Sequence, residues 1–152
     1  MHYFSNVIGQ TELSLLIDLA LSLIAGFIIG IERESRGKDA GISTYTMVIV
    51  GSMLFTFISS QVDPASESRI AAQIVSGIGF LGAGLIVKDG ASVKNLTTAA
   101  SIWVAGAIGM AFGFNYHFIG MIITLAVTLI PRIPHINKKS PESMIENKSR
   151  TN

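Results

Sequence analysis

The chain has 152 residues, a formal net charge of +1, 49% hydrophobic residues and only 14% charged residues. Soluble domains usually carry about 25% charged residues, so this composition excludes an ordinary soluble domain. The sequence contains no cysteine, which excludes disulfides, thiolate metal sites and a cysteine nucleophile. The small net charge gives no reason to expect nucleic acid as a partner. The composition therefore favours a membrane protein, with the lipid bilayer as its first partner.

Five apolar runs have the length, or nearly the length, of a membrane span. A helix needs about 20 mostly apolar residues to cross a hydrocarbon core of roughly 30 Å. In chain order the runs are Leu13–Ile31, Ser43–Ser60, Ile70–Val87, Thr98–Phe114 and Phe118–Ile133, the last of them short and interrupted at Pro131. The predicted fold class is all-α: a polytopic membrane protein whose compact bundle of about five transmembrane helices covers residues 13–133.

Lysine and arginine are distributed very unequally between the two sides of such a bundle. The N-terminal segment 1–12 and the loops 61–69 and 115–117 share one side, which contains Arg69 as its only Lys or Arg. The other side contains the remaining ten. Cytoplasmic loops carry the excess of Lys and Arg, so we expect the N-terminus outside and the C-terminus in the cytoplasm. The polar tail 134–152 is expected to be disordered.

Small residues recur every four positions in several spans. GxxxG pairs join Gly26 with Gly30 in the first span and Gly109 with Gly113 in the fourth. Small residues let helices approach closely in lipid, which favours a packing role and a homo-oligomer, most simply a dimer. The third span has four glycines in eight residues: Gly77, Gly79, Gly82 and Gly84. Each glycine costs roughly 1 kcal/mol of helix propensity relative to alanine, so this span either crosses a neighbour closely or is a broken helix at a polar cavity.

Asp18 is the ionisable residue placed deep within a predicted span. An ionised carboxylate at the centre of a bilayer costs at least about 2.5–3.5 kcal/mol, so it needs a partner or water. One hypothesis is a cation or proton site that Asp18 forms with Gln73, Ser76 or Ser101 from facing helices. The alternative is a protonated or hydrogen-bonded aspartate near the outer interface.

The loop after the first span mixes three acidic and three basic residues over positions 32–41. Positive-inside anchoring alone does not require the acids, so a role in gating or partner contact is one hypothesis and a solvated loop is the other. The next loop on that side contains a turn signal at Asp89, and Asn95 or Thr97 is expected to cap the fourth helix. The positive end of that helix would suit a nearby carboxylate. The predicted loop cluster comprises Glu32, Arg33, Glu34, Lys38, Asp89 and Thr97.

No residue pattern indicates catalysis. The sequence contains no GxSxG, P-loop or HExxH motif. The three histidines, His2, His117 and His135, have no metal-ligand spacing and are interpreted as interfacial. We expect no enzyme activity and no resident cofactor, while binding of Mg²⁺ stays open.

Three stretches carry a family resemblance. Gly26–Thr44 reads GFIIGIERESRGKDAGIST, Ser68–Gly84 reads SRIAAQIVSGIGFLGAG, and Leu96–Trp103 reads LTTAASIW, followed by AIG at Ala107–Gly109. In this order they resemble the signatures of the MgtC/SapB family, over roughly residues 18–130. By this match the family-typical positions are Asp18, Glu32, Arg33, Glu34, Gly37, Lys38, Gly41, Thr44, Arg69, Gln73, Ser76, glycines 77–84, Thr97, Thr98 and Trp103.

The resemblance implies a bacterial inner-membrane protein linked to magnesium homeostasis and to growth at low magnesium. Some members are called magnesium transporters, and others are regarded as regulators of other membrane proteins. We therefore expect a non-enzymatic protein that acts through oligomerisation or a membrane-protein partner. The alternative is a transporter or channel for Mg²⁺, another cation or a small solute. Longer relatives carry a cytoplasmic domain after the last span, and this chain is expected to be a short form without it.

Overall fold

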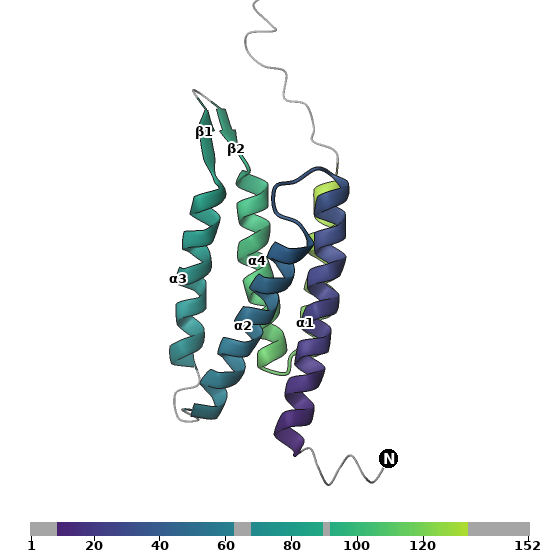
Figure 1. The fold of residues 1–152 in the computed structure, drawn as a ribbon, viewed down its shortest axis with the longest axis vertical. Helices are drawn as coiled ribbons and strands as arrows, with labels where there is room; N and C mark the ends of the chain where they lie inside the picture. Colours follow the sequence, from purple (N-terminus) through teal and green to yellow (C-terminus); the bar gives the residue numbers. More distant parts are fainter. Residues whose placement is uncertain (1–8, 63–67, 90–91, 134–152) are drawn as a thin grey trace, which may run out of the picture.

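A computed structural model describes residues 9–62, 68–89 and 92–133 of the chain. It contains five α-helices, whose bounds are α1 Gln10–Ser35, α2 Ile42–Val62, α3 Ser68–Leu85, α4 Leu96–Gly113 and α5 His117–Leu129. The helices form an elongated bundle (Figure 1). The mostly helical fold class is confirmed, and each of the five apolar runs coincides with a helix.

The boundaries of the first and last spans differ from the predicted ones. Helix α1 begins at Gln10, inside the segment expected to precede the first span. Helix α5 ends at Leu129 and continues as a 3₁₀ turn, η2, over Ile130–Arg132. Pro131 lies in that turn, and proline lacks the backbone N–H that a longer α-helix would need. The tail 134–152 lies outside the described residues.

A short β-hairpin between α3 and α4 is a feature that the apolar pattern does not predict. Strand β1, Val87–Asp89, pairs antiparallel with β2, Ser92–Lys94. Val87 lies opposite Lys94, and Lys88 lies opposite Val93. Because the hairpin and the C-terminal end of α1 lie at the same end of the bundle, we call this the hairpin end (Figure 1). The opposite end, where α1 begins, is called the N-terminal end.

Helices α2 and α4 form the centre of the packing. Helix α2 contacts α1, α3 and α4, and α4 also contacts α1, α3 and α5. Helix α5 packs against α1 and α4. Helices α1 and α3 therefore lie on opposite sides of α2 (Figure 1). The core contains Ile29 from α1, Ile49 from α2 and Phe112 from α4, all fully buried.

Four predicted packing glycines lie directly against backbone atoms of α2. A Cβ added at Gly26 would stand 2.5 Å from the Cα of Thr46, and one at Gly113 would stand 2.5 Å from the carbonyl oxygen of Met53. Gly30 meets the backbone of Ile42 in the same way, and Gly109 meets that of Ile49. These contacts show how closely α1 and α4 approach α2. Two further glycines are closely packed against side chains: Gly106 lies against Ile78, and Gly120 lies against Phe112.

Helix α3 is continuous, and its glycines are placed differently. Gly82 is buried, and an added Cβ would lie 3.6 Å from the carbonyl oxygen of Ala99. Gly77, Gly79 and Gly84 have open space where a Cβ would stand. Among the described residues of one chain, these three glycines have no neighbouring helix to approach. The break expected as one alternative does not occur within Ser68–Leu85.

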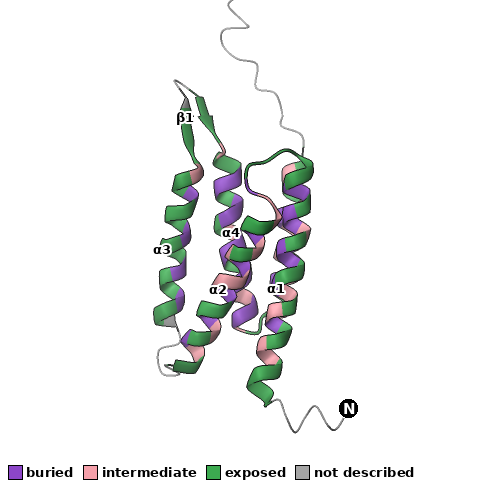
Figure 2. Ribbon diagram, in the orientation of Figure 1, coloured by how far each residue is buried: buried purple, intermediate pink, exposed green. Residues whose placement is uncertain are grey.

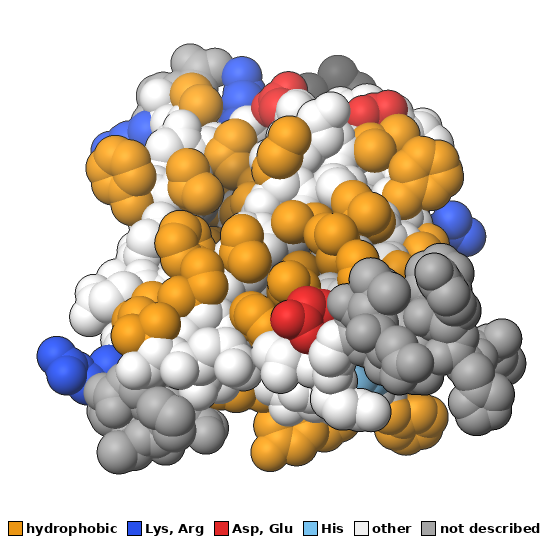
Figure 3. All heavy atoms as spheres, turned by 60° about the horizontal axis from the view of Figure 1, so that its bottom comes forward, with side chains coloured by type: hydrophobic (Ala, Val, Ile, Leu, Met, Phe, Trp, Pro, Cys, Tyr) orange, Lys and Arg blue, Asp and Glu red, His pale blue; other side chains and the backbone are white. Residues whose placement is uncertain are grey.

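The outside of the bundle is strongly apolar. Helices α1, α2 and α4 are long and apolar enough to cross a membrane, and α3 and α5 are shorter apolar helices. Exposed positions run along the outer sides of the helices (Figure 2). Figure 3 shows hydrophobic side chains over much of the visible surface, with Lys and Arg toward its margins. Soluble monomers rarely expose such large apolar areas, whereas lipid chains solvate them.

Candidate functional site

The N-terminal end of the bundle holds a pair between a buried carboxylate and a partly exposed imidazole. Oδ1 of Asp18 lies 2.6 Å from Nε2 of His117. Asp18 is fully buried on the inner side of α1, and His117 is the first residue of α5 and partly exposed. His117, which the sequence indicates as an interfacial residue, is the hydrogen-bonding partner of Asp18. The sequence offered one signal for this: both residues lie near ends of spans that an odd-numbered topology brings to the same side.

Buried oxygen atoms near this pair have unused hydrogen-bonding capacity. Within the described part of the chain, Oδ2 of Asp18 and Oγ of Ser22 have no hydrogen-bond partner. Ser22 lies one helical turn deeper than Asp18, on the same side of α1. Burial of oxygen atoms without hydrogen-bond partners costs free energy. A proton or a small cation bound at these two oxygen atoms would offset part of that cost.

A polar hollow lies beside the first turns of α1, on the N-terminal side of the Asp18–His117 pair. It has a volume of about 250 Å³, and its walls include Ser14, Ser60 and Asn115. Oγ of Ser14 donates a 2.7 Å hydrogen bond to the side-chain oxygen of Asn115. Ser14 is one turn from Asp18, so the hollow and the Asp18–His117 pair follow each other along α1.

The predicted partners of Asp18 do not gather around it. Gln73 and Ser76 are exposed on α3, across α2 from α1. Ser101 is buried, and its hydroxyl lies 2.5 Å from that of Tyr45. The four-residue constellation is therefore corrected to a pair between Asp18 and His117. The apolar pattern predicts where each helix lies along the chain. It does not predict which helices lie side by side around α2.

The hairpin end holds a buried ion pair. The side chains of Glu32 and Arg33 are 2% and 1% exposed, with 3.6 Å between Oε2 and Nε. Oε1 of Glu32 also accepts a 3.2 Å hydrogen bond from Nη1 of Arg36. Arg36 donates further to the carbonyl oxygen of Pro131, which ties the end of α1 to the turn after α5. Part of the predicted loop cluster is thus a structural element of the bundle.

The other members of the predicted loop cluster are more exposed. Oε1 of Glu34 accepts a 2.9 Å hydrogen bond from the backbone N–H of Ile42, so Glu34 caps the start of α2. Lys38 and Thr97 are exposed. The side chain of Asp89 lies outside the described residues. Glu34 therefore organises the start of α2.

A contact absent from the predicted cluster joins the two loops. Nδ2 of Asn95 donates a 2.6 Å hydrogen bond to Oδ2 of Asp39. Asn95 is the residue before α4 and has a φ of 64°, a left-handed conformation that asparagine tolerates. Its side chain does not cap the helix, contrary to expectation: Nδ2 bonds Asp39, and the left-handed backbone is not the extended conformation of a capping residue. Among the residues that the structure describes, no group of three or more His, Asp and Glu side chains is arranged to hold a metal ion.

Long apolar helices with a strongly apolar outer surface define an integral membrane protein. The chain belongs to the MgtC family, whose family model matches residues 19–136. It is 40% identical over 120 residues to Protein MgtC of Salmonella typhimurium, covering 77% of this chain and 52% of that protein. It is 42% identical over 118 residues to Protein MgtC of Brucella abortus, covering 75% and 50%.

The chain spans about half the length of these curated relatives. No solved structure matches it. The resemblance seen in the three signatures is confirmed.

Proposed function

We propose that the protein supports adaptation to low magnesium without catalysing a reaction, by binding other membrane proteins or further copies of itself. The family membership supports the link to magnesium, and the surface of α3 supports the mode of action. The proposal places the chain in a bacterial inner membrane, with the hairpin end toward the cytoplasm and the N-terminal end outside. Ten of the eleven Lys and Arg residues would then be cytoplasmic.

The observation that carries the proposal is the composition of the outer face of α3. This face includes Gln73, Ser76, Gly77, Gly79, Phe80 and Gly84, all exposed, and α3 also exposes the apolar Ile70, Val75 and Leu81. The face thus adds two polar residues and three glycines to a bundle whose outside is otherwise apolar. Lipid chains cannot bond an amide, and glycine offers them little contact, whereas a neighbouring helix gains from both. A protein-contact surface accounts for this composition.

A second candidate function is movement of a cation or small solute. The unpartnered Oδ2 of Asp18 and Oγ of Ser22 favour it, because they are buried oxygen atoms beside a partly exposed His117. Mg²⁺ gives up its water reluctantly and prefers several oxygen ligands. A proton or a partly hydrated cation suits one carboxylate better.

Reconstitution separates the two functions. The purified protein and its Asp18→Asn variant are placed in vesicles that contain a Mg²⁺-sensitive dye, and uptake is compared with protein-free vesicles. We expect the wild-type protein to show no more uptake than empty vesicles. In parallel, mild detergent extraction should give a complex larger than one chain. Gly77→Leu should reduce this complex, and Ala20→Leu, on the exposed side of α1, should leave it intact.

Rapid wild-type uptake that Asp18→Asn abolishes would overturn the proposal in favour of transport. Asparagine keeps the size of the side chain and its ability to bond His117, so it removes the charge with little change in packing. A single-chain particle for the wild-type protein would also count against action through contacts.

A further inference from the structure

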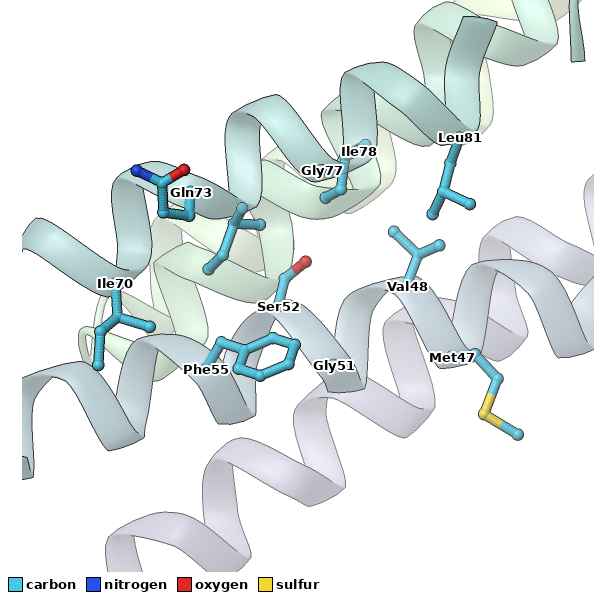
Figure 4. Close-up of a pocket in the computed structure, with 11 residues that line it drawn as sticks. Met47, Val48, Gly51, Ser52, Phe55, Ile70, Gln73, Gly77, Ile78 and Leu81 are labelled. Atoms are coloured by element: carbon cyan, nitrogen blue, oxygen red, sulfur yellow. The ribbon is translucent and has the colours of Figure 1, made fainter. Parts of the chain in front are cut away.

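A groove runs between α2 and α3, beside the outer face of α3. It has a volume of about 490 Å³, and Figure 4 shows the two helices that form its walls. Gly51 of α2 and Gly77 of α3 both line it, and both have open space where a Cβ would stand. Gly26 and Gly109 show the opposite pattern, because each lies directly against the backbone of α2. The packing of α3 on α2 therefore leaves room along this seam.

The lining of the groove is almost entirely apolar. Nine of its eleven lining residues are apolar or glycine, and Ser52 and Gln73 are the polar ones. Ile78 is a buried part of the lining, whereas the long side chains of Met47 and Phe55 line it and are exposed. Such a lining offers water few hydrogen bonds, but it gives a hydrocarbon chain dispersion contacts with two helices at once. The chemistry of the groove thus suits an acyl chain.

The length of the groove corresponds to the depth of one leaflet. Helix α3 runs along the long axis of the bundle (Figure 1). Its part of the lining extends from Ile70 to Leu81, which at a rise of 1.5 Å per residue is about 16 Å. Half of a hydrocarbon core of roughly 30 Å is about 15 Å. The groove can therefore accept one acyl chain of the leaflet at the N-terminal end of the bundle.

A cationic side chain lies at the N-terminal end of the groove. Gln73, Gly77 and Leu81 line the groove at intervals of four residues, and residues four apart lie on the same side of a helix. Arg69 continues this row one turn nearer the start of α3, and it is exposed. By sequence it is the only Lys or Arg on that side of the bundle. A guanidinium matches phosphate oxygens in pairs, so Arg69 is complementary in charge and shape to a phospholipid headgroup.

We propose that the α2–α3 groove binds one acyl chain of a membrane phospholipid, whose phosphate pairs with Arg69. The headgroup lies in the leaflet at the N-terminal end, and the chain follows the groove toward the middle of the bilayer. Ser76, Gly79 and Gly84 do not line the groove, so a bound lipid leaves them accessible on the outer face of α3. The proposal goes beyond the proposed function and does not depend on it.

Photolabelling in vesicles tests the acyl-chain site. The probe is phosphatidylglycerol with a diazirine near the end of one acyl chain, mixed into vesicles of phosphatidylethanolamine, and labelled residues are located by mass spectrometry. We expect several-fold more label on the groove residues than on the exposed side of α1, which reports bulk lipid. Gly51→Leu fills the groove from open space and should reduce its label several-fold. Ala20→Leu, on the exposed side of α1, should leave the groove label unchanged.

Competition tests the role of Arg69. Unlabelled phosphatidylglycerol should remove the groove label at a several-fold lower concentration than diacylglycerol, which has the same chains and no phosphate. Arg69→Gln should abolish this difference. Lys88→Gln is the matched control, because it removes an exposed cation at the hairpin end, and it should preserve the difference.

Equal labelling of all lipid-facing helices would overturn the proposal, because bulk lipid would then explain the label. Groove label that Gly51→Leu does not reduce would also overturn it, as would equal competition by the two lipids in the wild-type protein or an unchanged difference in Arg69→Gln. The complex expected in detergent is a separate measurement, so the lipid site and the protein-contact surface can fail independently.

Discussion

Gly109→Ala is expected to destabilise the bundle more than any other single-methyl change considered. An added Cβ would stand 2.7 Å from the Cβ of Ser52 and even closer to the backbone oxygen of Ile49. A backbone carbonyl cannot move aside as a flexible side chain can, so α4 must shift away from α2. Overpacking of this kind costs about 1–3 kcal/mol. The predicted result is a lower thermal unfolding midpoint in detergent and a smaller yield of monodisperse protein.

Gly51→Ala is the matched control, because it adds the same methyl group to a helix where nothing lies within 4 Å. Replacing glycine by alanine within a helix favours the helix by up to about 1 kcal/mol, so this variant should be as stable as the wild-type protein or more stable. If both variants unfold at the wild-type temperature, the close contact between α2 and α4 is wrong.

Arg33→Met should be the most damaging change at the hairpin end. It leaves the carboxylate of Glu32 buried, with only the more exposed Arg36 as a cationic partner. Removing one member of a buried ion pair typically costs about 3–5 kcal/mol, because the remaining charge is uncompensated. The expected result is a large loss of thermal stability. Lys38→Met removes a cation from an exposed position in the same loop and should change stability by no more than about 0.5 kcal/mol.

The double variant Glu32→Gln with Arg33→Met tests the physical reason. It removes both charges, so it should recover much of the stability that Arg33→Met loses. If the double variant is as unstable as the sum of two independent losses, the damage comes from packing of the long arginine side chain and not from an unpaired charge.

The apolar runs predicted the number and approximate positions of the helices well. A helix in lipid must satisfy its own backbone, so a long apolar run leaves little choice of structure. The short strands around Val87 and Lys94 were missed because three-residue strands carry too few residues to show a period. The end of α5 was predicted only approximately, since Pro131 permits a 3₁₀ turn after the last α-helical residue.

The candidate site was predicted less completely, for a physical reason. Burial cost identified Asp18 as a residue that needs a partner, but it did not identify the partner, because the order of helices around α2 depends on packing. Gln73 and Ser76 lie across α2 from Asp18, and His117 lies beside it. Similarly, glycine spacing suggested close packing in both α3 and α4. The two differ because Gly109 meets α2, whereas Gly77 has no neighbour within 4 Å among the described residues.

The most direct test of α3 as a contact surface is growth at limiting Mg²⁺ of a strain that depends on this protein. Cells carrying Gly77→Leu are compared with cells carrying Ala20→Leu, at equal amounts of protein in the membrane. Leucine at position 77 enters open space, so the single chain should fold normally. We expect Gly77→Leu to fail to support growth and Ala20→Leu to match the wild-type protein. Wild-type growth with Gly77→Leu would contradict a role of α3 as a contact surface.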